Sequence, residues 1–497
     1  MGAIVTKRRR RWAPLLGNDH LEFADSAGKV GLRNLGNTCF MNAGLQCLCH
    51  LEPFTAYFLS GKYREEVNAD NPLGNGGALA NAIAGLQRAL WQTRQAVHNP
   101  RELHSALRRC APHLFEGYEQ QDVQEFLAFC LDGLHEDLNL VKVRPPPTSE
   151  EQEEEDAKAV EGKDEEFAAA LSWMRYLERG KSFLVDLFQG QLRSCLTCLE
   201  CGFIARRFEP FLYLSVPVSG SSITSAIEKY LEEERLTGDE RWLCPRCDRR
   251  VDAKKKIDIW KLPPVLVLHI KRFEFDMRRF QFRKIDTLLN APLTIDLLPY
   301  VSSSQREHAT YDVTSVANHL GAFGSGHYTA YCRVGHEESD AWYHFNDDRV
   351  SAIRPDEVIT RNSYVIFLIR HAGDGQQIKR QTVSLPEVWP HWVSTRNSAM
   401  CDLLPGNRFQ TTPQADAPTS FSSERSPAGD SDSGCRDAAP SGASQTQKAP
   451  EELSGVSPPQ QLSRPKAKSK SPARQPARAP QPSRLGAPKA SPGPRGR

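Results

Sequence analysis

The sequence is organised around one stretch, Gly31-Leu-Arg-Asn-Leu-Gly-Asn-Thr-Cys39-Phe-Met-Asn-Ala-Gly-Leu-Gln46. Its first half is polar and contains glycines, which is typical of a tight turn. Asn37 and Thr38 are residue types that cap helix N-termini, and apolar residues recur at helical spacing after Cys39. We therefore predict a turn that leads into a buried helix, with Cys39 in the first helical turn.

The predicted position of Cys39 suits a nucleophile. Free backbone N–H groups and the dipole at a helix N-terminus stabilise a thiolate, which lowers a cysteine pKa from its usual value of about 8.5. Asn34 could direct an amide at the oxyanion that forms when a thiolate attacks a carbonyl. The alternative is that Cys39 is a small buried hydrophobe, as we expect for Cys47 and Cys49. A catalytic role requires a histidine and an orienting residue elsewhere in the chain.

The composition of the chain limits which classes of protein it can belong to. The 497 residues carry a net charge of +2 and are 39% hydrophobic, which predicts a folded part with disordered ends. The 13 cysteines, an odd number, and the lack of a visible secretory signal favour an intracellular chain that uses thiols for metal binding and chemistry. No apolar run approaches the roughly 20 residues of a membrane span. We expect the cytoplasm, the nucleus or both as the location.

The two ends of the chain differ from its middle. Residues 1–30 form a basic extension in which Gly2 fits an N-myristoylation pattern and the following Lys and Arg residues could supply a second membrane signal. A nuclear-import or nucleic-acid patch is the alternative. Residues 371–497 are rich in Pro, Ser and Ala and become basic after Gln461, which predicts a disordered tail able to contact nucleic acid or an acidic partner.

Residues 40–140 read mainly as helices. One predicted helix opens at Gln121 and Asp122, and its apolar residues form a buried stripe. Asp122 and Glu125 would share an exposed face near its N-terminus, where they either compensate the helix dipole or form a small acidic patch for a basic peptide. The next segment, residues 144–166, is rich in Pro and Glu and predicts an exposed, mobile insertion.

Two Cys-x-x-Cys pairs follow in a region of short predicted strands. We assign four cysteines to a tetrahedral structural zinc site, namely Cys198, Cys201, Cys244 and Cys247. Cys195 is left out, because only Cys201 is followed by the small residue that a zinc knuckle favours. Coincidental buried cysteines are the alternative. A metal here would hold strands together rather than catalyse.

The remaining strands supply a candidate base. Residues 265–275 predict a central strand buried on both faces at its start. Three glycines precede His327, which stands at the mouth of a strand where a base could reach across a cleft. Asn346 and Asp347 follow the next strand and could orient an imidazole on its neighbour. His319, His336 and His344 compete with His327 for the role of base.

The motifs together resemble those of the ubiquitin-specific proteases, a family of papain-like cysteine deubiquitinases. The opening stretch resembles their cysteine box, and residues 118–126 resemble their glutamine-aspartate box. Residues 262–273 resemble their central strand, and residues 326–331 and 342–347 resemble the two halves of their histidine box. The similarity covers residues 31–370. It implies an α+β fold with a helical thumb, a β-rich palm and zinc-bearing β fingers that grip ubiquitin.

The resemblance also implies roles for single residues. Cys39 would be the nucleophile, His327 the general base and acid, and Asn346 the third member of the triad. Asp347 would be an auxiliary group, and Asn34 would supply the oxyanion hole.

For the substrate, the resemblance implies that Asp122 and Glu125 meet the arginines of ubiquitin's tail, helped by Gln124. Phe273 and Tyr328 would line the channel for its Gly-Gly end. The implied activity is hydrolysis of the isopeptide or peptide bond after the last glycine of ubiquitin. Three alternatives remain open: a ubiquitin-binding pseudoenzyme or scaffold, a protease of another ubiquitin-like modifier, and a nucleic-acid-tethered adaptor led by the basic tail.

Overall fold

A computed structural model describes residues 26–115, 119–146, 148–160, 162–277, 279–303, 309–335 and 341–371. All of them belong to the first of two compact units, residues 1–409. Gly2, the basic run after it and the tail beyond residue 371 lie outside the described residues. Acylation, disorder of the tail and contacts of either end with membranes or nucleic acid therefore stay predictions. None of the described helices is long and apolar enough to cross a membrane.

Helices and strands alternate in blocks along the chain. The helices are α1 (Cys39–Cys49), α2 (Glu52–Ser60), α3 (Tyr63–Glu66), α4 (Ala78–Trp91), α5 (Arg101–Cys110), α6 (Val123–Asp137), α7 (Glu150–Val160), α8 (Glu165–Arg179), α9 (Phe183–Phe188) and α10 (Ile223–Tyr230), with 3₁₀ turns η2 (Pro112–Leu114), η3 (Gly238–Glu240), η4 (Leu298–Tyr300) and η5 (Pro355–Glu357). The strands are β1 (Gly31–Leu32), β2 (Val97–His98), β3 (Gly190–Cys198), β4 (Ile204–Phe211), β5 (Leu214–Pro217), β6 (Glu234–Leu236), β7 (Trp242–Cys244), β8 (Arg249–Val251), β9 (Ala253–Lys261), β10 (Val265–Lys271), β11 (Phe273–Asp276), β12 (Gln281–Lys284), β13 (Thr294–Asp296), β14 (Thr310–Ala322), β15 (Ser325–Val334), β16 (Ala341–Asn346), β17 (Arg349–Ile353) and β18 (Ser363–Arg370).

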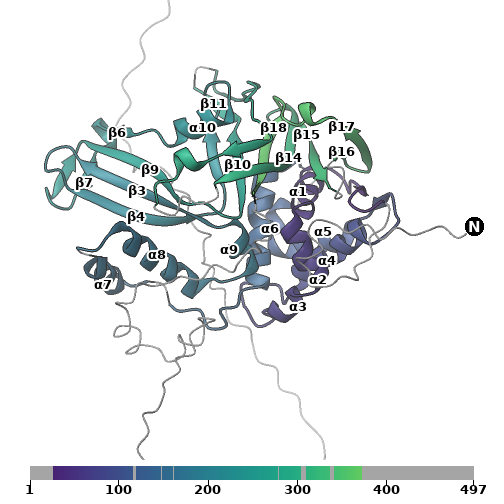
Figure 1. The fold of residues 1–497 in the computed structure, drawn as a ribbon, viewed down its shortest axis with the longest axis horizontal. Coiled ribbons are helices and arrows are strands. Elements are labelled where there is room, and N and C mark those ends of the chain that lie inside the picture. Colours follow the sequence, from purple (N-terminus) through teal and green to yellow (C-terminus); the bar gives the residue numbers. More distant parts are fainter. Residues whose placement is uncertain are drawn as a thin grey trace, which may run out of the picture. The chain divides into compact units, whose positions relative to one another are not determined.

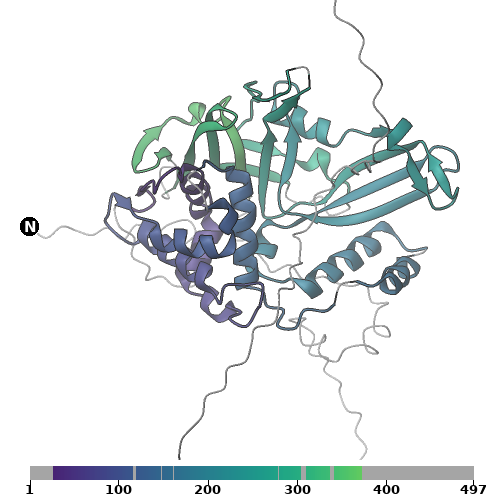
Figure 2. The same cartoon turned by 180° about the vertical axis from the view of Figure 1, so that it is seen from behind.

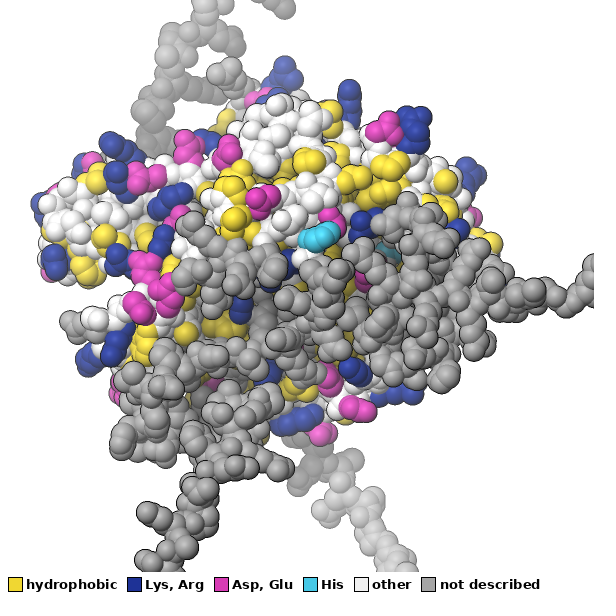
Figure 3. All heavy atoms as spheres, in the orientation of Figure 1, with side chains coloured by type: hydrophobic (Ala, Val, Ile, Leu, Met, Phe, Trp, Pro, Cys, Tyr) yellow, Lys and Arg dark blue, Asp and Glu magenta, His cyan; other side chains and the backbone are white. Residues whose placement is uncertain are grey.

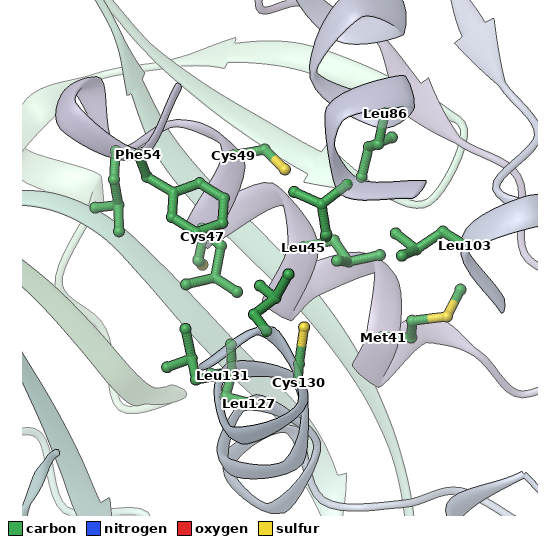
Figure 4. Close-up of a cluster of buried hydrophobic side chains, with 14 of the residues drawn as sticks. Met41, Leu45, Cys47, Cys49, Phe54, Leu86, Leu103, Leu127, Cys130 and Leu131 are labelled. Atoms are coloured by element: carbon green, nitrogen blue, oxygen red, sulfur yellow. The ribbon is translucent and has the colours of Figure 1, made fainter. Parts of the chain in front are cut away.

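Helix α1 lies at the centre of a helical region that contains α2 to α6 (Figure 1). Every residue of α1 is buried, which confirms the predicted buried helix. In Figure 4, Leu45 of α1 lies among Leu86 of α4, Leu103 of α5 and Leu127 of α6, which share one hydrophobic core. The other side of α1 packs against β15. The helix that begins with Cys39 therefore lies against the main sheet.

The main sheet has eight strands in the order β17-β16-β15-β14-β18-β10-β5, with β13 paired to β14. The predicted central strand, β10, runs antiparallel to β18 and parallel to β5. Val265 and Val267 join the core shared with the helical region, whereas Leu266 and Leu268 join a second core that includes α10. Alternate residues therefore face two different cores, which explains the continuous apolar start of this strand.

A second sheet, β4-β3-β9-β6, extends away from the helical region (Figures 1 and 2). Helix α8 packs against β4, where Ala169, Phe208 and Trp260 form a small core. The separate β7–β8 hairpin carries Cys244, and β3 ends at Cys198. The two predicted cysteine pairs therefore belong to the outer part of this finger-like sheet.

The Glu-rich segment has more structure than we predicted from its sequence. Where their burial is described, the residues of helix α7 are exposed or half-buried, but the segment is helical and is tied to α8. Asp156 of α7 accepts hydrogen bonds from the guanidinium of Arg175 of α8, the shorter at 2.8 Å. Lys158 and Glu154 form an additional pair one helical turn apart, 3.7 Å. A basic residue outside the segment therefore offsets part of its charge.

Asp137 joins two helices of the helical region. It ends α6 and is fully buried. Its carboxylate accepts hydrogen bonds from the backbone N–H of Asn75 (2.6 Å), Leu79 (2.9 Å) and Ala80 (3.1 Å). It therefore satisfies the free N–H groups at the start of α4, which has no side-chain cap of its own.

We expect Asp137→Asn to destabilise the protein by about 2–4 kcal/mol, because the amide group leaves buried donors without an acceptor. Urea unfolding followed by tryptophan fluorescence would measure the change. Asp132→Asn, on the exposed face of the same helix, serves as the control. Equal midpoints for the two variants would contradict this account.

Candidate active site

The turn before α1 is held by the side chain of Asn34. Its Oδ1 accepts hydrogen bonds from the backbone N–H groups of Gly36 (2.9 Å) and Thr38 (3.1 Å), and from the Thr38 hydroxyl (3.2 Å). Gly36 and Asn37 have φ values of 106° and 52°, a region that favours glycine and asparagine. The predicted turn is confirmed, and Cys39 is the first residue of α1 with 1% of its surface exposed.

Asp347 fixes the direction of the Asn34 amide. One carboxylate oxygen accepts a hydrogen bond from Nδ2 of Asn34 (3.0 Å), and the other accepts one from Nδ2 of Asn42 in α1 (2.8 Å). The backbone carbonyl of Asp347 also accepts a hydrogen bond from the N–H of Leu32 (2.8 Å). The turn after β16 is thus joined to both the turn before α1 and the helix itself. Asp347 lies where the sequence predicted an auxiliary group.

Gly31 is required by the close approach of these two turns. A Cβ atom at this position would lie 2.4 Å from the backbone carbonyl oxygen of Asp348, which is closer than real contacts allow. Backbone atoms cannot move aside as a flexible side chain can. The absence of a side chain at Gly31 therefore lets the Asp347 turn reach Asn34.

His327 and Asn346 are joined as predicted. They lie on β15 and β16, and Nε2 of His327 is 2.7 Å from Oδ1 of Asn346. An amide oxygen can only accept, so Nε2 is the donor, and in the neutral imidazole the lone pair is then on Nδ1. Of the competing histidines, His344 packs against Tyr331, His319 lies in an aromatic cluster, and His336 is outside the described residues.

Cys39 lies beside β15, but its sulfur is not hydrogen-bonded to the imidazole of His327. Both residues are described, and no hydrogen bond joins Sγ of Cys39 to His327. Burial raises the pKa of the Cys39 thiol, and the nearby charge of Asp347 raises it further. Hydrogen bonds from the backbone N–H groups of Tyr328 and Phe40 act in the opposite direction. The net direction is upward, so burial and Asp347 outweigh the backbone N–H groups at the start of α1, which still act toward the thiolate as expected.

The residues predicted to bind the substrate form two groups, one at a buried aromatic cluster and one on helix α6. Asp122 caps α6, Tyr328 is 5% exposed, and Phe273 is partly buried beside them in one aromatic cluster. Gln124 is partly buried and Glu125 is exposed on α6. The carboxylates of Asp122 and Glu125 therefore do not form one exposed patch, because Asp122 is turned inward.

Sequence reasoning missed three residues of this region. Tyr364 donates a hydrogen bond to Asp122 (2.6 Å), but it lies in an apolar strand and so resembled a core residue. Gln120 accepts a hydrogen bond at Oε1 from the N–H of Gly326 near the start of β15 (2.8 Å). Asn42 is a polar residue in an otherwise apolar buried helix, and that contrast was a usable signal.

Exposed aromatic side chains flank the glycine loop. The β11–β12 hairpin presents Phe275 and Phe282 to solvent, and Phe282 stacks on Phe323 of the loop at 4.4 Å. Figure 3 shows hydrophobic side chains at the surface where β14, β15 and β18 lie in Figure 1. The surface beside the candidate active site therefore includes exposed apolar side chains in addition to polar ones.

The four predicted metal ligands come together at the tip of the finger sheet. The sulfur atoms of Cys198, Cys201, Cys244 and Cys247 all lie within 4.8 Å of one another. The Cys198–Cys247 and Cys201–Cys244 separations are 3.8 and 3.7 Å. Zn–S bonds of about 2.3 Å in a tetrahedron place sulfurs about 3.8 Å apart, so the cluster fits one metal ion. Cys195 is not part of it.

Comparisons with solved structures support the fold class predicted from the sequence. A chain of the SAGA Ubp8/Sgf11/Sus1/Sgf73 DUB module bound to ubiquitin aldehyde superposes with a TM-score of 0.55 at 24% identity, over 71% of this chain and 72% of that chain. The same module bound to monoubiquitin gives a TM-score of 0.54 at 25% identity, again over 71% and 72%. The mixed helix-and-sheet architecture with a cysteine-bearing finger sheet is therefore that of a ubiquitin-specific protease domain.

Comparisons of sequence identify the family. Residues 30–368 match the model of the ubiquitin carboxyl-terminal hydrolase family. Rat ubiquitin carboxyl-terminal hydrolase 2 is 37% identical over 71% of this chain and 55% of its own length. The chicken protein of that name is 39% identical over 68% and 93%, and human hydrolase 21 is 34% identical over 69% and 61%. This chain thus spans about half the length of the rat relative. It belongs to the ubiquitin carboxyl-terminal hydrolases of the ubiquitin-specific protease type.

Proposed function

We propose that the chain is a cysteine-type deubiquitinase that hydrolyses the isopeptide or peptide bond after the last glycine of ubiquitin. The observation that carries this proposal is the 2.7 Å contact between Nε2 of His327 and Oδ1 of Asn346, made beside Cys39. It leaves Nδ1 as the free base of a cysteine–histidine pair. Family membership and solved relatives that hold ubiquitin and its aldehyde support ubiquitin as the partner.

In the proposed mechanism, Cys39, Asn34 and His327 act in successive steps of the reaction. Nδ1 of His327 takes the proton from Cys39, and the thiolate forms a C–S bond to the carbonyl carbon of the terminal glycine. The amide of Asn34, held by Asp347, stabilises the oxyanion. His327 then protonates the leaving amine as the C–N bond breaks. Next it takes a proton from water, whose oxygen forms a C–O bond to the acyl carbon as the C–S bond breaks. The imidazolium then returns the proton to the sulfur and restores the thiol. Asn346 keeps the imidazole oriented throughout.

Cys39→Ala tests the reaction directly. We expect turnover of a ubiquitin–aminocoumarin amide to fall by about 10⁴-fold or more, because the nucleophile is lost. Cys195→Ala, a half-buried cysteine of the finger sheet, is the control and should keep its activity. Turnover by Cys39→Ala would refute the assignment. A wild-type protein that binds ubiquitin without turnover would be a pseudoenzyme, and turnover only with another modifier would change the substrate.

The reactivity of Cys39 should depend on pH in a specific direction. Its pKa is raised in the free protein, so the thiol stays protonated until the pH exceeds the usual cysteine value of about 8.5. We therefore expect iodoacetamide to modify Cys39 at a rate that still increases above that pH. Mass spectrometry of the Cys39 peptide after timed reactions would measure it. A rate that reaches its plateau below pH 7 would show a thiolate and contradict this expectation.

We also propose that the four-cysteine cluster holds a structural Zn²⁺. The sulfur spacing and the all-cysteine ligand set support zinc, which would join β3 to the β7–β8 hairpin. Cys244→Ser should lower the zinc content from about one ion per chain toward zero and reduce the melting temperature, because the metal contributes to folding. Atomic spectrometry and calorimetry would test both effects. Cys195→Ser is the matched control, and equal zinc content in the two variants would exclude this site.

A further inference from the structure

The start of strand β15, which carries His327, has a strand beside it on one side only. Strand β14 pairs with β15 from Ser325 to Cys332, whereas β16 pairs with it only from Ala330 to Val334. Within the described part of the chain, residues 325–329 therefore have β14 as their one strand neighbour. Because the N–H groups of a strand point alternately to its two sides, this end of β15 has backbone donors that no strand satisfies.

Gln120 supplies an acceptor for one of these donors. Its Oε1 accepts a hydrogen bond of 2.8 Å from the backbone N–H of Gly326. Only the oxygen of a side-chain amide can accept a hydrogen bond, so this contact also fixes which way the amide is turned. Gln120 lies before α6, 206 residues earlier in the chain than Gly326. The contact therefore joins the segment before α6 to the residue that precedes His327.

The same segment also holds the residue that follows His327. Asp122 lies two positions after Gln120 and caps α6 with its carboxylate. It accepts a hydrogen bond of 3.4 Å from the hydroxyl of Tyr328. His327 thus stands between two residues that are each hydrogen-bonded to the short segment 120–122, one through its backbone and one through its side chain.

The backbone at Gly326 has little room on its other side. A Cβ atom at this position would overlap the imidazole of His319 on β14, and it would lie 2.7 Å from the backbone carbonyl oxygen of Leu320. The direction in which the next side chain leaves the strand is set by this backbone. That side chain is His327, whose Nε2 reaches Oδ1 of Asn346 at 2.7 Å.

We propose that Gln120 is a positioning residue for catalysis, which takes the place of a missing strand beside Gly326 and so keeps His327 directed at Asn346. The role is carried by the hydrogen bond to the backbone of β15 rather than by a contact with the substrate. The proposal rests on the proposed role of His327 as the base of the cysteine–histidine pair.

The test removes the acceptor and keeps a side chain of similar size. In Gln120→Leu we expect the amide hydrogen of Gly326 to exchange with solvent about fivefold faster, and kcat for a ubiquitin–aminocoumarin amide to fall about fivefold with KM unchanged, because each measures the loss of one hydrogen bond. Gln120→Glu should restore both values, since a carboxylate oxygen can still accept the bond. Glu119→Leu, a change at the exposed neighbouring residue, is the control.

Two of the readouts need no ubiquitin and therefore test the positioning role even if the proposed deubiquitinase activity fails. Exchange is followed by mass spectrometry of peptides from β15. The ¹H–¹⁵N signal of Nε2 of His327, assigned with His327→Gln, should broaden in Gln120→Leu because the imidazole is held less firmly at Asn346.

The proposal is overturned if Gln120→Leu leaves either the exchange of Gly326 or the His327 signal unchanged. It is also overturned if this variant raises KM alone, because the amide then acts on the substrate. Should Gln120→Leu melt at a lower temperature than the wild type, Gln120→Asn decides the outcome by the same measurements. Its amide stays polar but is one methylene too short to reach Gly326.

Discussion

The packing of α1 against β15 is the contact on which the candidate active site depends. It brings Cys39 and His327 to one place although they are far apart in the sequence. The contact is apolar, since α1 is buried on every side and alternate residues of β15 join the same core. Hydrophobic packing therefore sets the position of the site, and hydrogen bonds adjust the groups within it. Gly31 contributes by the space that it leaves for the Asp347 turn.

Much of this arrangement could be predicted from the sequence, because local patterns carry it. The glycine-containing turn, the buried helix after it and the apolar strand at residues 265–271 each follow from residue types at fixed spacing. The two Cys-x-x-Cys pairs predict a metal site for the same reason, because the ligand spacing within each pair is local in the sequence. His327 was found because a glycine loop and a strand meet at that residue.

Other features depend on partners that no local pattern reveals. Thr38 occupies the N-cap position of α1, yet its hydroxyl makes no cap hydrogen bond and instead accepts one from the N–H of Leu35 (2.9 Å). Tyr364 looked like a core residue until its hydroxyl was seen to reach Asp122. The helical form of the Glu-rich segment depends in part on Arg175, which lies outside that segment. In each case the deciding partner is distant in the sequence or competes with the expected one.

The raised pKa of Cys39 follows in part from a conflict between two requirements of the proposed reaction. The oxyanion needs a fixed amide, and Asp347 fixes Asn34, but the negative charge of Asp347 opposes a thiolate at the neighbouring sulfur. Burial, the largest cause, acts in the same direction, and the backbone N–H donors only partly offset it. A neutral thiol is therefore the expected form of the free protein. In the proposed reaction, ionisation of Cys39 then requires His327 to accept its proton.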